Sequence, residues 1–96
     1  MSDPDEPKAP QPPALIEYPT HYTFKAMGLA GPGFRELVRG IVAAVVGELE
    51  HGAITERPSS AGKYLSLSVH VYLQSEDQRR AVYEAFHKEK AIVWYV

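Results

Sequence analysis

The chain has 96 residues and contains no cysteine, and five of its eight prolines lie within the first 13 residues. A chain of this length forms one small domain without room for two lobes and a cleft, which excludes most nucleotide-binding α/β enzymes. The missing cysteine excludes disulfide frameworks, zinc ribbons, thiol nucleophiles and iron–sulfur ligand sets. The formal net charge is −2, and from residue 15 onward nine acidic residues stand against nine basic ones, which argues against binding nucleic acid or an anionic membrane.

The first 14 residues differ from the rest of the chain in composition. They are rich in proline and acidic residues and contain almost nothing to bury, so we expect residues 1–14 to form a disordered tail and residues 15–96 a single domain. This start lacks the basic and apolar regions of a secretory signal, and apolar runs such as residues 41–46 are far shorter than a membrane span. We therefore expect a cytoplasmic protein without membrane contact.

The residues after Pro19 predict a strand and then a helix. Over residues 20–28 apolar and polar side chains alternate with the period of two that a half-buried strand shows. Over residues 34–49 the apolar residues recur at helical spacing, and we expect this helix to end at His51-Gly52, because glycine suits the left-handed position beyond a helix end. Gly40 and Gly47 lower the helix propensity, and we interpret them as points where the helix packs closely on a sheet.

The middle of the chain predicts a β-hairpin. Residues 53–57 form a short strand candidate that ends at Pro58, and residues 59–63 form its connection to the next strand. Residues 65–73 alternate regularly between apolar and polar side chains, which predicts a strand with one face on the core and one face in solvent.

The last part of the chain predicts a helix and a final strand. The Ser75 hydroxyl is placed to cap the amide of Gln78, whose side chain is placed to bond back, and the acidic residues between them favour the positive end of a helix. Residues 91–96 are apolar on both sides, as expected of a strand against helices with at least one paired neighbour.

This order of elements predicts the fold class. Two strand–helix–strand units joined by a hairpin, each with a right-handed crossover, place both helices on one face of a four-stranded antiparallel sheet with the strand order 4-1-3-2. The chain is therefore expected to be an α+β domain with the ferredoxin-like βαββαβ arrangement.

Two stretches of the sequence resemble a known family. They read Tyr18-Pro19-Thr20-x-Tyr22-x-Phe24-Lys25-x-Met27-Gly28 and Pro58-Ser59-Ser60-x-Gly62-Lys63-Tyr64-x-Ser66-x-Ser68. Together they resemble the YbeD-like family of small bacterial proteins of unknown function, over residues 15–96. The resemblance implies a domain similar in shape to the ACT domains that sense amino acids in metabolic enzymes, and with it a stand-alone regulatory or ligand-sensing role.

The side of the sheet that faces away from the helices is the first candidate site. Lys25 of the first strand is expected beside the residues of the longest strand that point away from the core, namely Tyr64, Ser66, Ser68, His70 and Tyr72. Exposed aromatic side chains on a regular sheet mark a contact surface for a partner, a ligand or a second copy of the chain. RNA-recognition domains also stack bases on such a face, but this sequence lacks their Lys/Arg-Gly-Phe-Gly-Phe pattern.

The hairpin connection is the second candidate site. We expect Ser59 and Ser60 to bond the local backbone and Gly62 to adopt a positive φ. The functional alternative is an anion-binding loop in which Lys63 supplies the charge. The sequence has no G-x-S-x-G elbow, and its Gly62-Lys63 pair lacks the other glycine of a phosphate-binding loop.

Catalysis and metal binding find little support in the sequence. The four histidines, His21, His51, His70 and His87, lie on different elements without a metal-binding spacing, so we expect surface histidines and no metal or cofactor. Our expectation is a non-enzymatic regulatory protein that binds a partner protein or a small metabolite. The alternatives are an RNA-binding module that uses the open sheet face and a purely structural homodimer.

Overall fold

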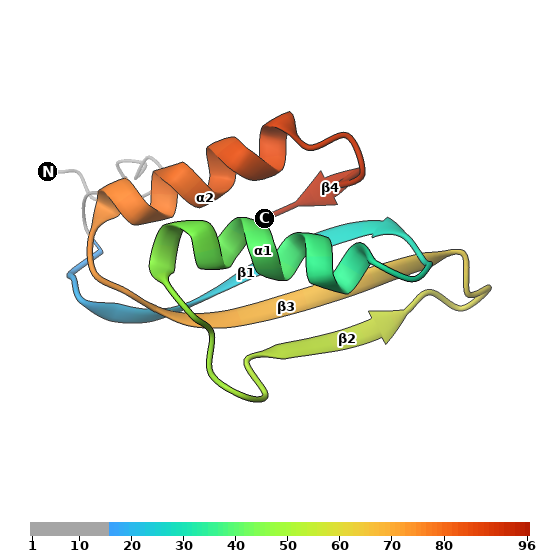
Figure 1. Ribbon diagram of the computed structural model, residues 1–96, viewed down its shortest axis with the longest axis horizontal. Coiled ribbons are helices and arrows are strands. Elements are labelled where there is room, and N and C mark those ends of the chain that lie inside the picture. Colours follow the sequence, from blue (N-terminus) through green and yellow to red (C-terminus); the bar gives the residue numbers. More distant parts are fainter. Residues whose placement is uncertain (1–15) are drawn as a thin grey trace, which may run out of the picture.

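The computed structural model describes residues 16–96 and confirms the predicted α+β arrangement (Figure 1). The elements in chain order are β1 (Thr20–Leu29), α1 (Phe34–Val46), β2 (Ile54–Pro58), β3 (Tyr64–Leu73), α2 (Glu76–Lys88) and β4 (Trp94–Tyr95). The four strands form one antiparallel sheet in the order β2-β3-β1-β4, which is the predicted order. The predicted tail at residues 1–14 lies outside the described residues.

The register between β1 and β3 decides which side chains form the core. Phe24 pairs with Val69 and Ala26 pairs with Leu67, and all four side chains are buried. They meet Val38 and Val42 of α1 together with Val82 and Phe86 of α2. Because strand side chains alternate, the residues between the buried ones lie on the opposite face, which neither helix covers. We call this uncovered side the open face.

The two helices begin and end for different reasons. The Gln78 amide donates to Ser75 Oγ at 3.2 Å, which confirms the predicted cap of α2. The Gln78 side chain accepts a hydrogen bond from the Gln74 amide at 2.8 Å instead of returning to Ser75. The predicted end of α1 at His51-Gly52 is wrong, because the helix ends at Val46 and Gly47 follows it with a φ of 94°. The residue at position 49 still packs against the core, which is why the helical spacing extended too far.

The glycine that permits close packing lies on β1. Nothing lies within 4 Å of a β-carbon built on Gly40, so the predicted close approach of α1 at this position is wrong. Gly47 is equally open and serves to end the helix. At Gly28, by contrast, a β-carbon would stand 2.5 Å from Cε1 of Phe34 and would also meet the carbonyl oxygen of Ala91.

Both edge strands differ from their predicted bounds, β2 by one residue at each end and β4 by four residues. β2 begins one residue later than expected and includes Pro58, which an edge strand accommodates because the missing amide faces no neighbour. β4 has two residues and one paired neighbour, β1. Val93 and Val96, which flank the two residues of β4, form further backbone hydrogen bonds to β1. The side chains of Val93, Trp94 and Val96 are nevertheless half exposed. Of the apolar run, Ile92 is the residue buried in the core.

Candidate functional site

The structure brings the predicted residues of the open face together. In the β1–β3 register Lys25 pairs with Ser68, Thr23 with His70, and His21 with Tyr72. Ser66 and Tyr64 continue the same row toward the hairpin. The predicted residues of both strands therefore form one continuous surface.

Polar and aromatic contacts connect the side chains on the open face. Thr23 Oγ1 and His70 Nδ1 share a hydrogen bond of 2.9 Å, and the rings of His21 and Tyr72 lie 4.8 Å apart. Tyr72 keeps 50% of its surface exposed. A hydroxyl beside an imidazole resembles a nucleophile–base pair, but no carboxylate among the paired strand residues lies on this face to orient the imidazole.

The outer strands also contribute to this surface, which the sequence alone did not indicate. The register puts Thr55 opposite Ser68 and Arg57 opposite Ser66, so both β2 side chains belong to the open face. Trp94 belongs to it as well, since it lies opposite Met27. The alternation that would have revealed Trp94 is hidden in the sequence because every residue from 91 to 96 is apolar.

Charge is unevenly distributed between the two faces of the sheet. Among the paired residues of the four strands, the open face carries Lys25 and Arg57 and no aspartate or glutamate. Glu56 lies on the helix side, where it forms an ion pair with Arg35 of α1 at 3.1 Å. The balanced total charge of the domain therefore does not reveal that the paired strand residues of the open face carry positive charge alone.

The predicted hairpin loop uses much of its hydrogen-bonding capacity internally. The Tyr64 amide donates to Ser59 Oγ at 3.1 Å, and the Gly62 amide donates to the Ser59 carbonyl at 2.9 Å. Gly62 has the predicted positive φ, at 77°. Ser60 is exposed, and Lys63 lies over the Tyr64 ring with its Nζ 5.6 Å from the ring centre. Because these amides already donate hydrogen bonds within the loop, they favour its structural role over the predicted anion site, in which Lys63 would supply the charge.

Two hollows lie at opposite ends of the open face. The smaller one, of about 170 Å³, is lined by Met27, Arg57, Pro58, Ser59, Tyr64 and Ser66. The larger one, of about 470 Å³, lies at the α1–β2 connection and includes His21, His51 and His70, together with Glu48 and Glu50, in its lining. Three histidines from different elements thus share one hollow. Within residues 16–96 no group of three or more histidine or acidic side chains is placed to hold a metal ion.

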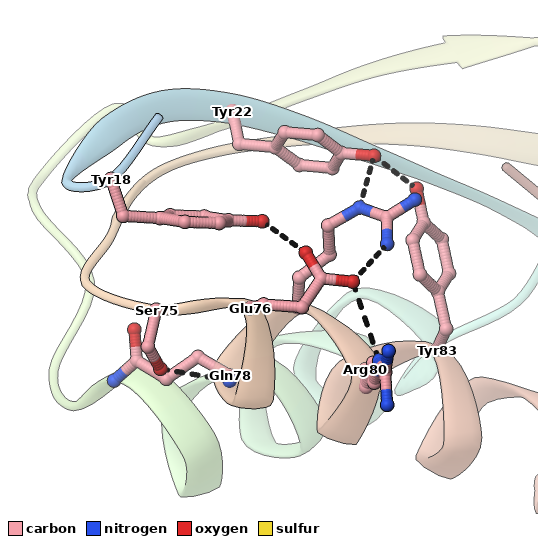
Figure 2. A network of polar contacts seen from close by, with 8 residues as sticks. Tyr18, Tyr22, Ser75, Glu76, Gln78, Arg80 and Tyr83 are labelled. Atoms are coloured by element: carbon pink, nitrogen blue, oxygen red, sulfur yellow. Dashed lines mark hydrogen bonds and ion pairs between the residues drawn. The ribbon is translucent and has the colours of Figure 1, made fainter. Parts of the chain in front are cut away.

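A second polar cluster lies on the helix side, at the start of α2 (Figure 2). Glu76 is its centre: it accepts hydrogen bonds from the Tyr18 hydroxyl at 2.5 Å and from Arg79 at 2.9 Å. Arg79 also donates to the Tyr22 hydroxyl at 3.2 Å, and that hydroxyl lies 2.9 Å from the hydroxyl of Tyr83. The cluster joins the segment before β1 to α2.

The ionisation of this cluster supports a structural role. The hydrogen bond from Tyr18 lowers the pKa of Glu76 below its ordinary value, with Arg79 adding to the effect. Burial and the bond to Glu76 raise the pKa of Tyr18 to about 12, and burial raises the pKa of Tyr83 as well. At neutral pH the carboxylate is therefore charged and both phenols are neutral, so the cluster holds no base poised near pH 7.

The fold and the open face define a small α+β domain with an uncovered sheet surface, whose paired strand residues include two cations and no carboxylate. A family described as a protein of unknown function (DUF493) matches residues 13–96. A UPF0250 protein of Janthinobacterium is 43% identical over 72 residues, which are 75% of this chain and 79% of that protein. A UPF0250 protein of Hahella chejuensis is 41% identical over 68 residues, or 71% of this chain and 75% of that one. The corresponding protein of Ralstonia nicotianae is 38% identical over 81 residues, or 84% of both chains.

The chain therefore belongs to this bacterial family of unknown function, which confirms the resemblance stated from its sequence. No helix within residues 16–96 combines the length and the apolar character that crossing a membrane requires.

Proposed function

We propose that this chain is a non-catalytic regulatory domain whose open face binds an acidic surface of a partner protein. The observation that carries the proposal is the composition of that face. It combines the cations Lys25 and Arg57 with exposed aromatic rings, and no carboxylate lies among its paired strand residues. Such a surface attracts negative charge and offers apolar area beside it.

The small size of the hollow beside Arg57 favours a protein over a small ligand at the cations of the face. The hollow within reach of Arg57 measures about 170 Å³, which is below the range of about 300–1,000 Å³ that is typical of small-molecule pockets. A broad partner surface can instead contact residues on all four strands at once. The larger hollow at the other end of the face, of about 470 Å³ beside His21, is large enough for a small metabolite.

A second candidate function is RNA binding, favoured by the same combination of rings and cations. Tyr64, Tyr72 and Trp94 lie on one face with Lys25, and base stacking on aromatic rings of an open sheet is how RNA-recognition domains read single strands. Two cations on the face supply a weaker phosphate attraction than such domains use, so we place this function second.

Charge reversal on the open face tests the proposal. The full chain is immobilised beside two variants, Lys25→Glu/Arg57→Glu and the control Arg39→Glu/Lys88→Glu. The control reverses the charge of two helix side chains that are exposed or partly exposed. We expect the parent and the control to retain the same bacterial protein from a lysate, and the retained amount to fall as the salt concentration rises. The open-face variant should retain at least about ten-fold less of this protein.

Two probe series separate the alternatives in the same experiment. Retention of poly(U) by the parent and not by the open-face variant would show that the face binds RNA instead of a partner protein. A rise in melting temperature with an anionic metabolite, caused by a gain in folding free energy of about RT ln(1 + [L]/Kd), would instead assign a small ligand to this chain. Equal retention by the parent and Lys25→Glu/Arg57→Glu would contradict the proposal.

A further inference from the structure

The outer side of β4 carries main-chain groups that no other strand of residues 16–96 pairs. Lys25 and Val96 exchange both of their backbone hydrogen bonds, at 2.8 and 3.0 Å. In an antiparallel ladder the next pair, Ala26 with Tyr95, is then a non-hydrogen-bonded pair. The amide and carbonyl of Tyr95 therefore point away from β1 and toward the outer edge.

The two edges of the sheet are protected to different degrees. β2 carries Glu56, Arg57 and Pro58, and charged residues and proline are the features that keep edge strands from pairing with other chains. The run from 91 to 96 contains no charge, no proline and no glycine. Val93, Trp94 and Val96 expose 57%, 49% and 49% of their surfaces. The β4 edge is thus short but open and apolar, and it lacks the charges and proline that β2 carries.

We propose that a second copy of this chain pairs with β4 in antiparallel orientation about a two-fold axis at Tyr95. At the axis, Tyr95 and the partner's Tyr95 exchange two backbone hydrogen bonds. Trp94 then lies opposite the partner's Val96, and the reverse contact repeats across the axis. The two sheets of four strands become one continuous sheet, with an apolar row across the junction of their open faces.

A second copy fits this edge for reasons of symmetry and charge. One donor and one acceptor at the same residue are self-complementary under a two-fold axis, as an isologous interface requires. Each Lys25 is separated from its equivalent by both copies of β4, which is about 14 Å at the spacing of strands and beyond the screening length. The like charges therefore do not oppose the pairing. Residues 1–15 of the same chain are a poor substitute, because their five prolines lack the amide hydrogens of a ladder.

The size of the edge sets the strength of the contact. A short strand and a few half-exposed side chains bury an area at the lower end of specific interfaces, below about 1,200 Å². We therefore expect a reversible dimer whose mass, measured by sedimentation equilibrium on the full chain, rises toward twice the monomer mass between about 10 µM and about 1 mM. The variant Trp94→Lys should remain a monomer over this range, whereas Lys25→Glu/Arg57→Glu should still dimerise, which separates this inference from the proposed function.

Cysteine cross-linking tests the register, because the natural chain has no cysteine. The Cα atoms of a hydrogen-bonded antiparallel pair lie about 5.5 Å apart, within the range of a disulfide. We expect Tyr95→Cys to form a covalent dimer on mild oxidation, and the β2-edge control Thr55→Cys to remain a monomer. Since Tyr95 also packs against α2, a mixture of Trp94→Cys and Val96→Cys provides a second test, and we expect it to form the mixed dimer.

Three results would overturn the inference. One is a parent chain that remains a monomer at about 1 mM. Another is a Trp94→Cys and Val96→Cys mixture that cross-links no more than Thr55→Cys. The third is a folded Tyr95→Cys that stays monomeric while an added extended peptide binds β4, which would assign the edge to a different protein.

Discussion

Gly28 and Gly40 both lie inside regular elements, but their surroundings predict opposite effects of the same substitution. We expect Gly28→Ala to lower the free energy of unfolding by about 1–3 kcal/mol, because the new methyl group would overlap the carbonyl oxygen of Ala91 and the Phe34 ring. Gly40→Ala should raise it by about 1 kcal/mol, since the position is open and alanine is the better helix former. Urea unfolding of both variants measures the two effects. A stabilised Gly28→Ala would contradict the described packing of β1, and a destabilised Gly40→Ala would contradict the open surroundings of Gly40 on α1.

Glu76 predicts how stability depends on pH. Its pKa lies below the ordinary value of 4.5 in the folded chain, mainly through the hydrogen bond from Tyr18. Between the two pKa values the unfolded chain binds more protons, so the contribution of Glu76 is complete above about pH 4.5 and is lost as pH falls through the folded pKa. We expect Glu76→Gln to be less stable than the parent at pH 7 and the difference to shrink below about pH 4.5.

Thermal unfolding of the parent and Glu76→Gln from pH 7 to pH 3 measures this effect. The control is Glu84→Gln, which removes one carboxylate from the exposed side of the same helix. A gap between the parent and Glu76→Gln that stays constant over the whole range would show that Glu76 is not coupled to folding.

At the scale of elements, the β2–β3 hairpin depends on the backbone conformation of Gly62. The residue has a φ of 77°, and a β-branched side chain is strained in that region. We expect Gly62→Val to lower the free energy of unfolding by about 1–3 kcal/mol. Ala61→Val is the control, because Ala61 is exposed in the same loop and has a negative φ. Equal stability of the two variants in a urea titration would contradict the hairpin geometry.

The elements that were predictable from the sequence are those with a clear period. The alternation along β1 and β3 and the cap at Ser75 each specify local structure through a few neighbouring residues, and each was confirmed. The end of α1 was not predictable, because Leu49 packs on the core from a loop and imitates one more helical turn. The length of β4 was not predictable either, since an apolar run gives the same pattern whether one face or two faces are covered.

At the scale of the whole molecule, the candidate site was predictable only in its central strands. Alternation places Tyr64 and His70 on one face, but the contribution of Arg57 and Trp94 depends on long-range register, which one sequence does not encode locally. The same holds for charge: the sum over the chain is nearly zero, and only the fold separates Lys25 from Glu56 onto opposite faces. The candidate site therefore depends on how the strands are paired, more than on any single motif.

The central claim is that the open face serves binding and not the stability of the fold. The most direct test is retention of the lysate partner on the immobilised double variant His70→Ser/Tyr72→Ser beside the parent. Both side chains are exposed and lie on the face away from the core, so we expect the free energy of unfolding to change by less than about 1 kcal/mol. We predict that the folded variant loses the partner that the parent retains. A folded variant that retains the same partner to the same extent would contradict the account.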